Sequence, residues 1–218
     1  MRLFPVLYGI KADKMAIKKH LILLILVLAP FMGAKGQTVG VKTNFLYDAT
    51  LTPNVGIEIG LSPRWTAEMS GSFNGWILSE GKRWKHWLVQ PEVRYWFCDR
   101  FGGHFVGAHV LGGQYNFGGF DGKVKLPGWD RDLKYVGTDF GAFRDTRYQG
   151  WYAGLGVAYG YAWVLGDHWN LEAEIGAGYV YTEYDRFRCT GCGKKVAEAV
   201  PHHYVGPTKG TLSLVYVF

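Results

Sequence analysis

The chain has 218 residues, a length that suits one domain, and 48% of them are hydrophobic, 17% aromatic and 31 glycine. This composition favours an all-β chain. The formal net charge of +6 belongs largely to the first 36 residues, because the remaining 182 hold 18 Lys and Arg against 17 Asp and Glu, a net of +1. Nucleic-acid binding needs a basic surface on the folded domain, so we exclude nucleic acid as a partner.

The segment before Gln37 has the pattern of a secretory signal peptide. Lys18, Lys19 and His20 precede the apolar run LILLILVLAPFM, which is followed by small residues in GAKGQ. This run is shorter than the roughly 20 residues that a membrane-spanning helix needs. We therefore expect residues 1–36 to be a cleaved signal peptide, with Met15 as a second candidate start, and residues 37–218 to form the mature domain.

After this segment, apolar residues alternate with small or polar ones at a period of two, which predicts strands with one apolar face. Eight such segments occur, starting near Val39, Val55, Trp65, Trp87, Gly103, Trp151, Trp169 and Thr211. We expect the first to continue to Tyr47. The fifth carries no charged residue, so its phase is ambiguous, and we place Phe105, Gly107, His109 and Leu111 on its outward face.

The connections between these segments alternate in length. Residues 62–64, 99–103 and 166–168 are tight turns, whereas 74–85, 116–147 and 185–203 are long, charged loops. Short turns at one rim and long loops at the other are typical of outer-membrane barrels, as are two girdles of aromatic residues. We expect one girdle at the short-turn rim (Trp65, Phe97, Phe105, Trp163, Trp169, Phe218) and one toward the loops (Phe73, Trp87, Tyr115, Trp151, Tyr181).

These patterns predict an all-β fold, an eight-stranded antiparallel up-and-down transmembrane β-barrel in the outer membrane of a Gram-negative bacterium, in contact with outer-membrane lipid. A soluble lipocalin-like barrel is the alternative. Its outer face would need abundant charge, but here the polar face holds mostly Gly, Ala, Ser and Thr. The final strand, TLSLVYVF, is expected to pair with the first, and it resembles the signal that the barrel assembly machinery recognises during insertion.

The few charged residues of the strands share the predicted inner face. Because an eight-stranded barrel is just wide enough for side chains, we expect a structural ion-pair network and no diffusion pore. The alternative is that these residues form a proton- or ion-conducting path. The network is predicted to consist of Lys42, Glu58, Glu68, Glu92, Arg94, Glu172 and Glu174.

The motif CTGC in the last long loop allows three readings. Cys189 and Cys192 could form a disulfide, which we favour in an exported loop; they could bind a metal together with His202 and His203, or carry redox chemistry. Cys98 is left without a partner. No motif joins His86, His202 and His203 with Asp185 and Thr190, so we expect no catalytic site, cofactor or bound metal.

Two stretches, TNFLYDATLTPNVGIEIGL and KHWLVQPEVRYW, resemble a family of small outer-membrane β-barrels of unknown function, DUF3575-like, from gut and oral Gram-negative anaerobes. The resemblance covers nearly all of residues 37–218 and implies a barrel without an established catalytic role, in some members in a fimbria-associated context. Loop 116–147 carries six cations, five anions and several aromatic residues, which suits a recognition surface. We expect a non-enzymatic envelope protein that acts through its outer loops, with fimbrial or surface proteins as partners. The alternatives are a purely structural barrel and a rim-located outer-membrane enzyme.

Overall fold

The computed structural model describes residues 38–76, 83–119, 146–188 and 194–218, together with the backbone of four short strands between 123 and 139. The expected signal peptide, Met15, Cys189, Thr190 and Cys192 lie outside the described residues. Within the described part of the chain, no helix is long and apolar enough to span a bilayer.

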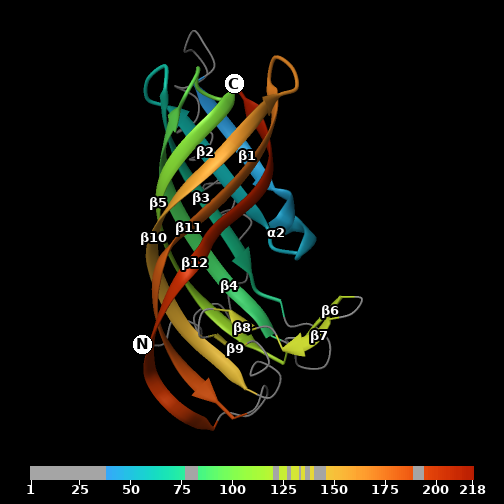
Figure 1. The fold of residues 1–218 in the computed structure, drawn as a ribbon, viewed down its shortest axis with the longest axis vertical. Helices are drawn as coiled ribbons and strands as arrows, with labels where there is room; N and C mark the ends of the chain where they lie inside the picture. The colour runs from blue at the N-terminus through green and yellow to red at the C-terminus, as the bar shows by residue number, and fades with distance from the viewer. Residues whose placement is uncertain are drawn as a thin grey trace, which may run out of the picture.

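Eight antiparallel strands form one sheet that closes on itself as a barrel (Figure 1). Neighbouring strands in the ring follow one another in the chain, and the last pairs with the first, so the topology is up-and-down. Around the ring the strands are β1 (Val39–Asn44), β2 (Asn54–Gly60), β3 (Trp65–Asn74), β4 (Arg83–Trp96), β5 (Gly103–Gly118), β10 (Arg147–Val164), β11 (Trp169–Phe187) and β12 (Lys195–Val217).

Four further short strands form two separate hairpins within the long connection between β5 and β10. They are β6 (Lys123–Leu126) with β7 (Trp129–Asp132), and β8 (Lys134–Tyr135) with β9 (Thr138–Asp139). Part of the predicted loop 116–147 is therefore strand.

The ring is closed by five residue pairs between β1 and β12, from Gly40↔Val217 to Asn44↔Ser213. The Phe218 N–H also donates to the Val39 carbonyl at 2.8 Å. The predicted pairing of the last strand with the first is confirmed, and the three expected tight turns do connect β2 to β3, β4 to β5 and β10 to β11 at the rim that holds the C-terminus (Figure 1).

The first strand is shorter than predicted. It ends at Asn44, and a single helical turn, α2 (Phe45–Ala49), follows where we expected strand up to Tyr47. The side chain of Asn44 accepts a hydrogen bond from the Leu46 N–H at 3.1 Å, so Asn44 caps this helix. The turn carries Tyr47 inward, while Phe45 and Leu46 remain exposed.

The last hairpin is longer than predicted. Residues 185–203 were expected to form a loop, yet β11 continues to Phe187 and β12 begins at Lys195. Pairs such as Tyr181↔His203 and Glu183↔Pro201 extend the sheet past the end of β1, with a bulge opposite Gly176 and Ala177. Pro201 and Pro207 hid this strand from sequence analysis, since proline cannot donate to a ladder and argues against a central strand.

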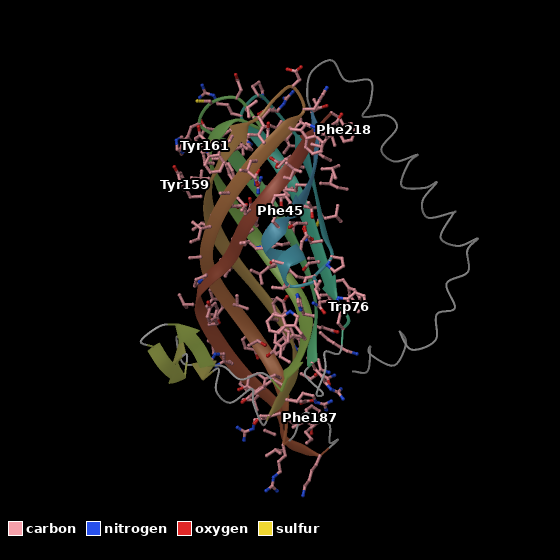
Figure 2. The ribbon with its side chains drawn as sticks, turned by 90° about the vertical axis from the view of Figure 1, so that its right-hand side faces the viewer. Phe45, Trp76, Tyr159, Tyr161, Phe187 and Phe218 are labelled. Atoms are coloured by element: carbon pink, nitrogen blue, oxygen red, sulfur yellow. The ribbon has the colours of Figure 1, made fainter. Side chains whose placement is uncertain are left out.

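The inward and outward faces agree with the predicted alternation in seven of the eight strands. The outward Leu155 and Ile175 are 61% and 68% exposed, whereas Glu172 and Glu174 on the inner face are 2% and 5% exposed. Aromatic rings gather outside near both ends of the barrel, and Figure 2 shows Tyr159, Tyr161 and Phe218 at the short-turn end.

The predicted phase of β5 is wrong. Phe105, Gly107, His109 and Leu111 point into the barrel, and Val106 and Val110 point outward. The reason is the space available inside the barrel. Phe105 packs there against Trp96, with ring centroids 4.6 Å apart, and Gly160 of β10 leaves room for its ring. Phe105 and the inward, half-buried Tyr115 therefore do not belong to the outer aromatic girdles.

Candidate functional site

All seven predicted lumen residues meet in one cluster inside the barrel. Arg94, on β4, lies at its centre and is fully buried. Its guanidinium contacts carboxylates from four strands: Glu58 (2.8 Å), Glu68 (2.5 Å), Glu92 (2.5 Å), Glu172 (3.0 Å) and Glu174 (2.7 Å). The planar fork of arginine suits such multidentate binding.

Lys42 supplies a second cation from β1. Its Nζ lies 2.6 Å from Glu58, 3.0 Å from Glu68 and 3.1 Å from Glu172. Since β1 closes the barrel against β12, this lysine ties the closing strand to the carboxylates of β2, β3 and β11. The charges therefore hold the ring together across its interior as well as along its ladders.

Sequence analysis missed a third cation, Lys209 of β12. Its Nζ lies 2.8 Å from Glu92, 3.1 Å from Glu174 and 3.6 Å from Glu68. Lys209, Thr211 and Ser213 alternate on the inner face, and this alternation is the signal that could have identified Lys209. The predicted last strand starts only at Thr211 and therefore leaves Lys209 out.

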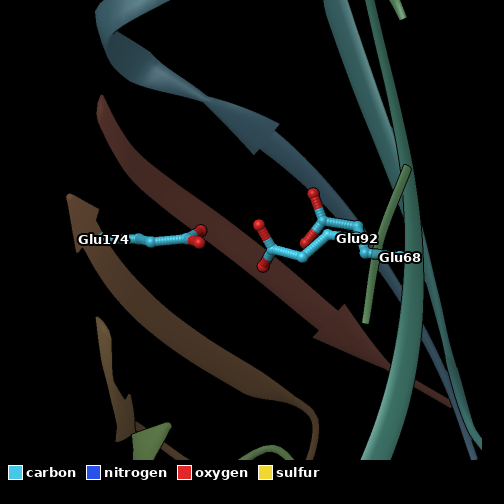
Figure 3. Close-up of side chains that lie close together, drawn as sticks. All are labelled: Glu68, Glu92 and Glu174. Carbon is cyan, nitrogen blue, oxygen red and sulfur yellow. The ribbon is translucent and has the colours of Figure 1, made fainter. Parts of the chain in front are cut away.

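Glu68, Glu92 and Glu174 bring their carboxylates close enough together to suggest a metal site (Figure 3). However, the Lys209 ammonium contacts all three of them. An ammonium group thus stands where a metal ion would have to bind, and a metal would need to displace a buried lysine.

His109 and Thr66 complete the cluster. His109 Nδ1 lies 3.4 Å from Glu92 and its Nε2 lies 2.9 Å from the Thr208 hydroxyl. The Thr66 hydroxyl donates to Glu58 at 2.5 Å. His109 was assigned to the wrong face, because β5 carries no formal charge that would have fixed its phase.

An apolar plug fills the lumen between the cluster and the short turns. Trp96 and Phe105 are fully buried, the guanidinium of Arg94 lies 4.5 Å from the Phe105 ring centroid, and the Trp96 Nε1 donates to Thr66 at 2.9 Å. Phe101, from the turn after β4, packs with Val215 and Val217 of β12. The described side chains that pack together at this level are apolar.

Toward the long loops the lumen is lined by aromatic side chains. Tyr115 stacks on Phe117 at 5.3 Å and lies 6.0 Å from the Tyr152 ring, and its hydroxyl is 3.0 Å from that of Thr182. Rings of this kind occupy the interior with few formal charges. They separate the ion-pair cluster from the outer rim.

The residues considered for catalysis do not form one site. His202 and His203 are consecutive in β12 and so point to opposite faces; His203 contacts Tyr179 and Tyr181 on the outside. Asp185 is bound by Lys195 at 2.9 Å. Burial alone would raise the pKa of Asp185, but the hydrogen bonds from Lys195 and the Ala199 N–H outweigh it and lower that pKa. Cys98 is exposed and has no disulfide partner among the described residues.

The structure defines a closed eight-stranded barrel that encloses a cluster of buried charged residues and an apolar plug, and whose outer wall is largely apolar. The family comparison agrees with the resemblance noted above: the chain belongs to the family described as "Protein of unknown function (DUF3575)", whose model matches residues 21–218. A search of the curated proteins finds no match.

Proposed function

We propose that this protein is an outer-membrane β-barrel, exported by a cleaved signal peptide at residues 1–36 and inserted in contact with lipid. The observation that carries the proposal is the reversed polarity of the wall. Eight fully or nearly buried charged residues fill the interior, whereas large apolar side chains such as Leu155, Val157 and Ile175 are more than 60% exposed. Soluble proteins show the opposite arrangement, and lipid is the solvent that suits this one.

A soluble lipid- or ligand-binding barrel fits less well. Such a protein would need an apolar interior for its cargo and a charged exterior for solubility. Here the interior holds Arg94 with its five carboxylates, and the middle of the outer face consists of residues such as Ile57, Val93 and Ala177. Side chains already occupy the space that a cargo would need.

We propose further that the barrel has no enzymatic role and acts through its outer side. The strands β11 and β12 extend past the end of β1, and the connection of residues 119–146 carries most of the predicted recognition loop. Fimbrial or other surface proteins are the proposed partners. A purely structural role in the envelope is the second candidate, favoured by the dense internal ion pairing.

The membrane location can be tested with single-cysteine variants on a Cys98→Ser, Cys189→Ser and Cys192→Ser background. Leu155→Cys and Ile175→Cys should react with a lipid-soluble maleimide in isolated outer membranes, and Ala158→Cys, on the inner face of the same strand as Leu155, should not. Unheated protein should also migrate faster on SDS gels than boiled protein. A detergent-free, monomeric, water-soluble mature chain would contradict the proposal.

The recognition role can be tested by shortening one connection. Replacing residues 119–146 by a short Gly-Ser turn keeps the Gly118↔Arg147 pair, so the barrel should still fold. Cross-linking on intact cells followed by mass spectrometry should recover surface subunits with the native chain and lose them with the shortened one. A loop of equal length and scrambled order is the matched control. Identical cross-links from all three chains would favour the purely structural role.

A further inference from the structure

Three cations follow the tryptophans at the loop end of the outer wall. On β4, Lys85 and Arg83 lie two and four residues past Trp87, and on β10, Arg147 lies four residues past Trp151. Side chains two residues apart share a face of a strand, so these cations lie on the outer face with the tryptophans. Four residues rise about 13 Å along a strand, which carries the cations from the tryptophan girdle into the layer of lipid headgroups.

The ladders bring these cations together. We call Arg83, Lys85 and Arg147 the rim cations. Arg83 and Arg147 both pair with Gly118 of β5, which lies between them and has no side chain to separate them. Because neighbouring strands are about 4.8 Å apart, the two backbones are about 10 Å apart, and the charge of Arg83 acts unfavourably on that of Arg147. Figure 2 shows nitrogen-tipped side chains around the labelled Phe187 at this end of the barrel.

Arg147 is oriented by a neighbour but is not fully hydrogen-bonded. Its guanidinium carbon lies 4.0 Å from the centroid of the Phe187 ring, on β11. Stacking on an aromatic face fixes the plane of a guanidinium, and the N–H groups at its edge can still donate. The Arg147 Nε is buried and has no hydrogen-bond partner among the described groups, which is unfavourable for a charged donor. An acceptor bound at this side chain would remove that cost.

The described carboxylates do not neutralise the rim cations, since none of them forms an ion pair with any of the three. Asp185, which pairs with Gln149 across the ladder, is bound by Lys195 at 2.9 Å. Glu183 pairs with Trp151 on the same outer face. Even with Glu183 counted against them, the three cations keep an excess of positive charge. This part of the wall therefore suits an anionic partner.

An apolar hollow of about 580 Å³ lies on the same three strands, on the membrane side of the rim cations. Trp87 and Trp151 flank it, and both pair with Gln114 of β5. Gly112 opens its floor, because a Cβ there would have only the Tyr152 carbonyl oxygen within 4 Å, at 3.8 Å. The rest of the outward lining is Val89, Pro91 and Val110. A charged headgroup at the rim cations would thus continue into an acyl chain in the hollow.

We propose that the outer wall at β4, β5 and β10 binds one phosphorylated lipid of the outer leaflet, with a phosphate group at the rim cations and an acyl chain in the hollow. The inference rests on the proposed membrane location, because only there does this face meet lipid. A phosphate suits the site because it can accept from two guanidinium groups and an ammonium group at once. A free anion would make no use of the hollow.

Native mass spectrometry of the detergent-purified mature protein tests the ligand. The probe is bis-phosphorylated lipid A, and the comparison compounds are the same lipid A without its phosphates and inorganic phosphate. We expect the dephosphorylated lipid to bind at least about tenfold more weakly and excess inorganic phosphate to leave the lipid bound. Equal binding of the two lipids overturns the proposal. Displacement of the lipid by inorganic phosphate alone would show a free-anion site and would also overturn it.

Variants test the residues. Arg83→Gln/Arg147→Gln should bind bis-phosphorylated lipid A at least about tenfold more weakly and lose the preference for phosphate. Arg64→Gln/Arg186→Gln removes the same charge from the short-turn rim and from the other face of β11, so it should bind like the native chain. Gly112→Leu fills the hollow and should weaken the binding of both lipids while keeping the preference.

Each variant is compared only if its unheated gel band shows a folded barrel. Equal affinities of the two double variants overturn the inference. A protein that stays soluble without detergent, and whose gel band does not shift on heating, would instead contradict the membrane location.

Discussion

Arg94 interacts with more of the lumen charges than any other described residue, since its guanidinium contacts all five carboxylates of the cluster. Removing one partner of a buried ion pair leaves the others uncompensated, which costs about 3–5 kcal/mol. We therefore expect Arg94→Met to lower the free energy of unfolding by about that amount. Urea unfolding of the barrel in lipid vesicles, followed by tryptophan fluorescence, measures it.

A matched substitution separates the loss of the ion-pair cluster from the loss of an arginine as such. Arg64→Met removes an arginine that is exposed at the short-turn rim, so its effect should stay within about 0.5 kcal/mol. Adding Glu172→Gln to Arg94→Met should restore part of the lost stability, because one of the stranded charges disappears. Equal effects of Arg94→Met and Arg64→Met would show that the cluster does not stabilise the fold.

At the scale of elements, the glycines of β10 set how closely β5 can fill the lumen. A Cβ on Gly160 would come within 2.3 Å of the Phe105 ring and 2.8 Å of the Ala173 carbonyl. One of these contacts is backbone, so the clash cannot be relieved by moving a flexible side chain. The row of small residues in β10 is thus the counterpart of the large inward residues in β5.

Gly160→Ala should therefore destabilise the barrel by roughly 1–3 kcal/mol, the usual cost of overpacking. Gly210→Ala in β12 is the control, because a Cβ there meets no atom within 4 Å, and it should be neutral within about 0.5 kcal/mol. The two variants are compared in the same urea titration. A neutral Gly160→Ala would mean that the Phe105 plug is loosely packed.

The same strands show how far the sequence could predict the fold. Where a strand carries charges, as Glu172 and Glu174 do in β11, their shared face set the phase correctly. In β5 no formal charge distinguishes the faces. Only the contact between Phe105 and Gly160 of the neighbouring strand β10 decides which face points inward. Such a contact depends on register, which a single sequence does not provide.

The residues of the ion-pair cluster, like the strands, were predicted for the most part but not completely. Seven lumen residues were found by alternation, but Lys209 was missed because two prolines and a bulge obscured the start of β12. The inward position of Tyr47 could not be predicted either. It depends on the helical turn α2, whose Asn44 cap competes with a strand pattern that continues to Tyr47.

At the scale of the whole molecule, the lumen has successive levels along the barrel. The apolar plug of Trp96, Phe101 and Phe105 lies at the short-turn end, the ion-pair cluster lies next to it, and the aromatic level with Tyr115 and Tyr152 lies toward the loops. Eight-stranded barrels have room for side chains and none for a channel. Each level on its own should block the passage of solutes.

The purified protein should therefore produce no stepwise conductance in a planar lipid bilayer at 100 mV, under conditions where a 16-stranded porin opens. The double variant Trp96→Ala with Phe105→Ala should also show no stepwise conductance, because the ion-pair cluster still fills the next level. Adding Arg94→Ala removes the centre of that cluster, and brief openings are expected only in this triple variant, provided that its unheated gel band shows it folded. Regular openings of the wild-type chain would mean that the lumen rearranges in the membrane. The buried carboxylates would then be better explained as part of a proton- or ion-conducting path than as a structural ion-pair network.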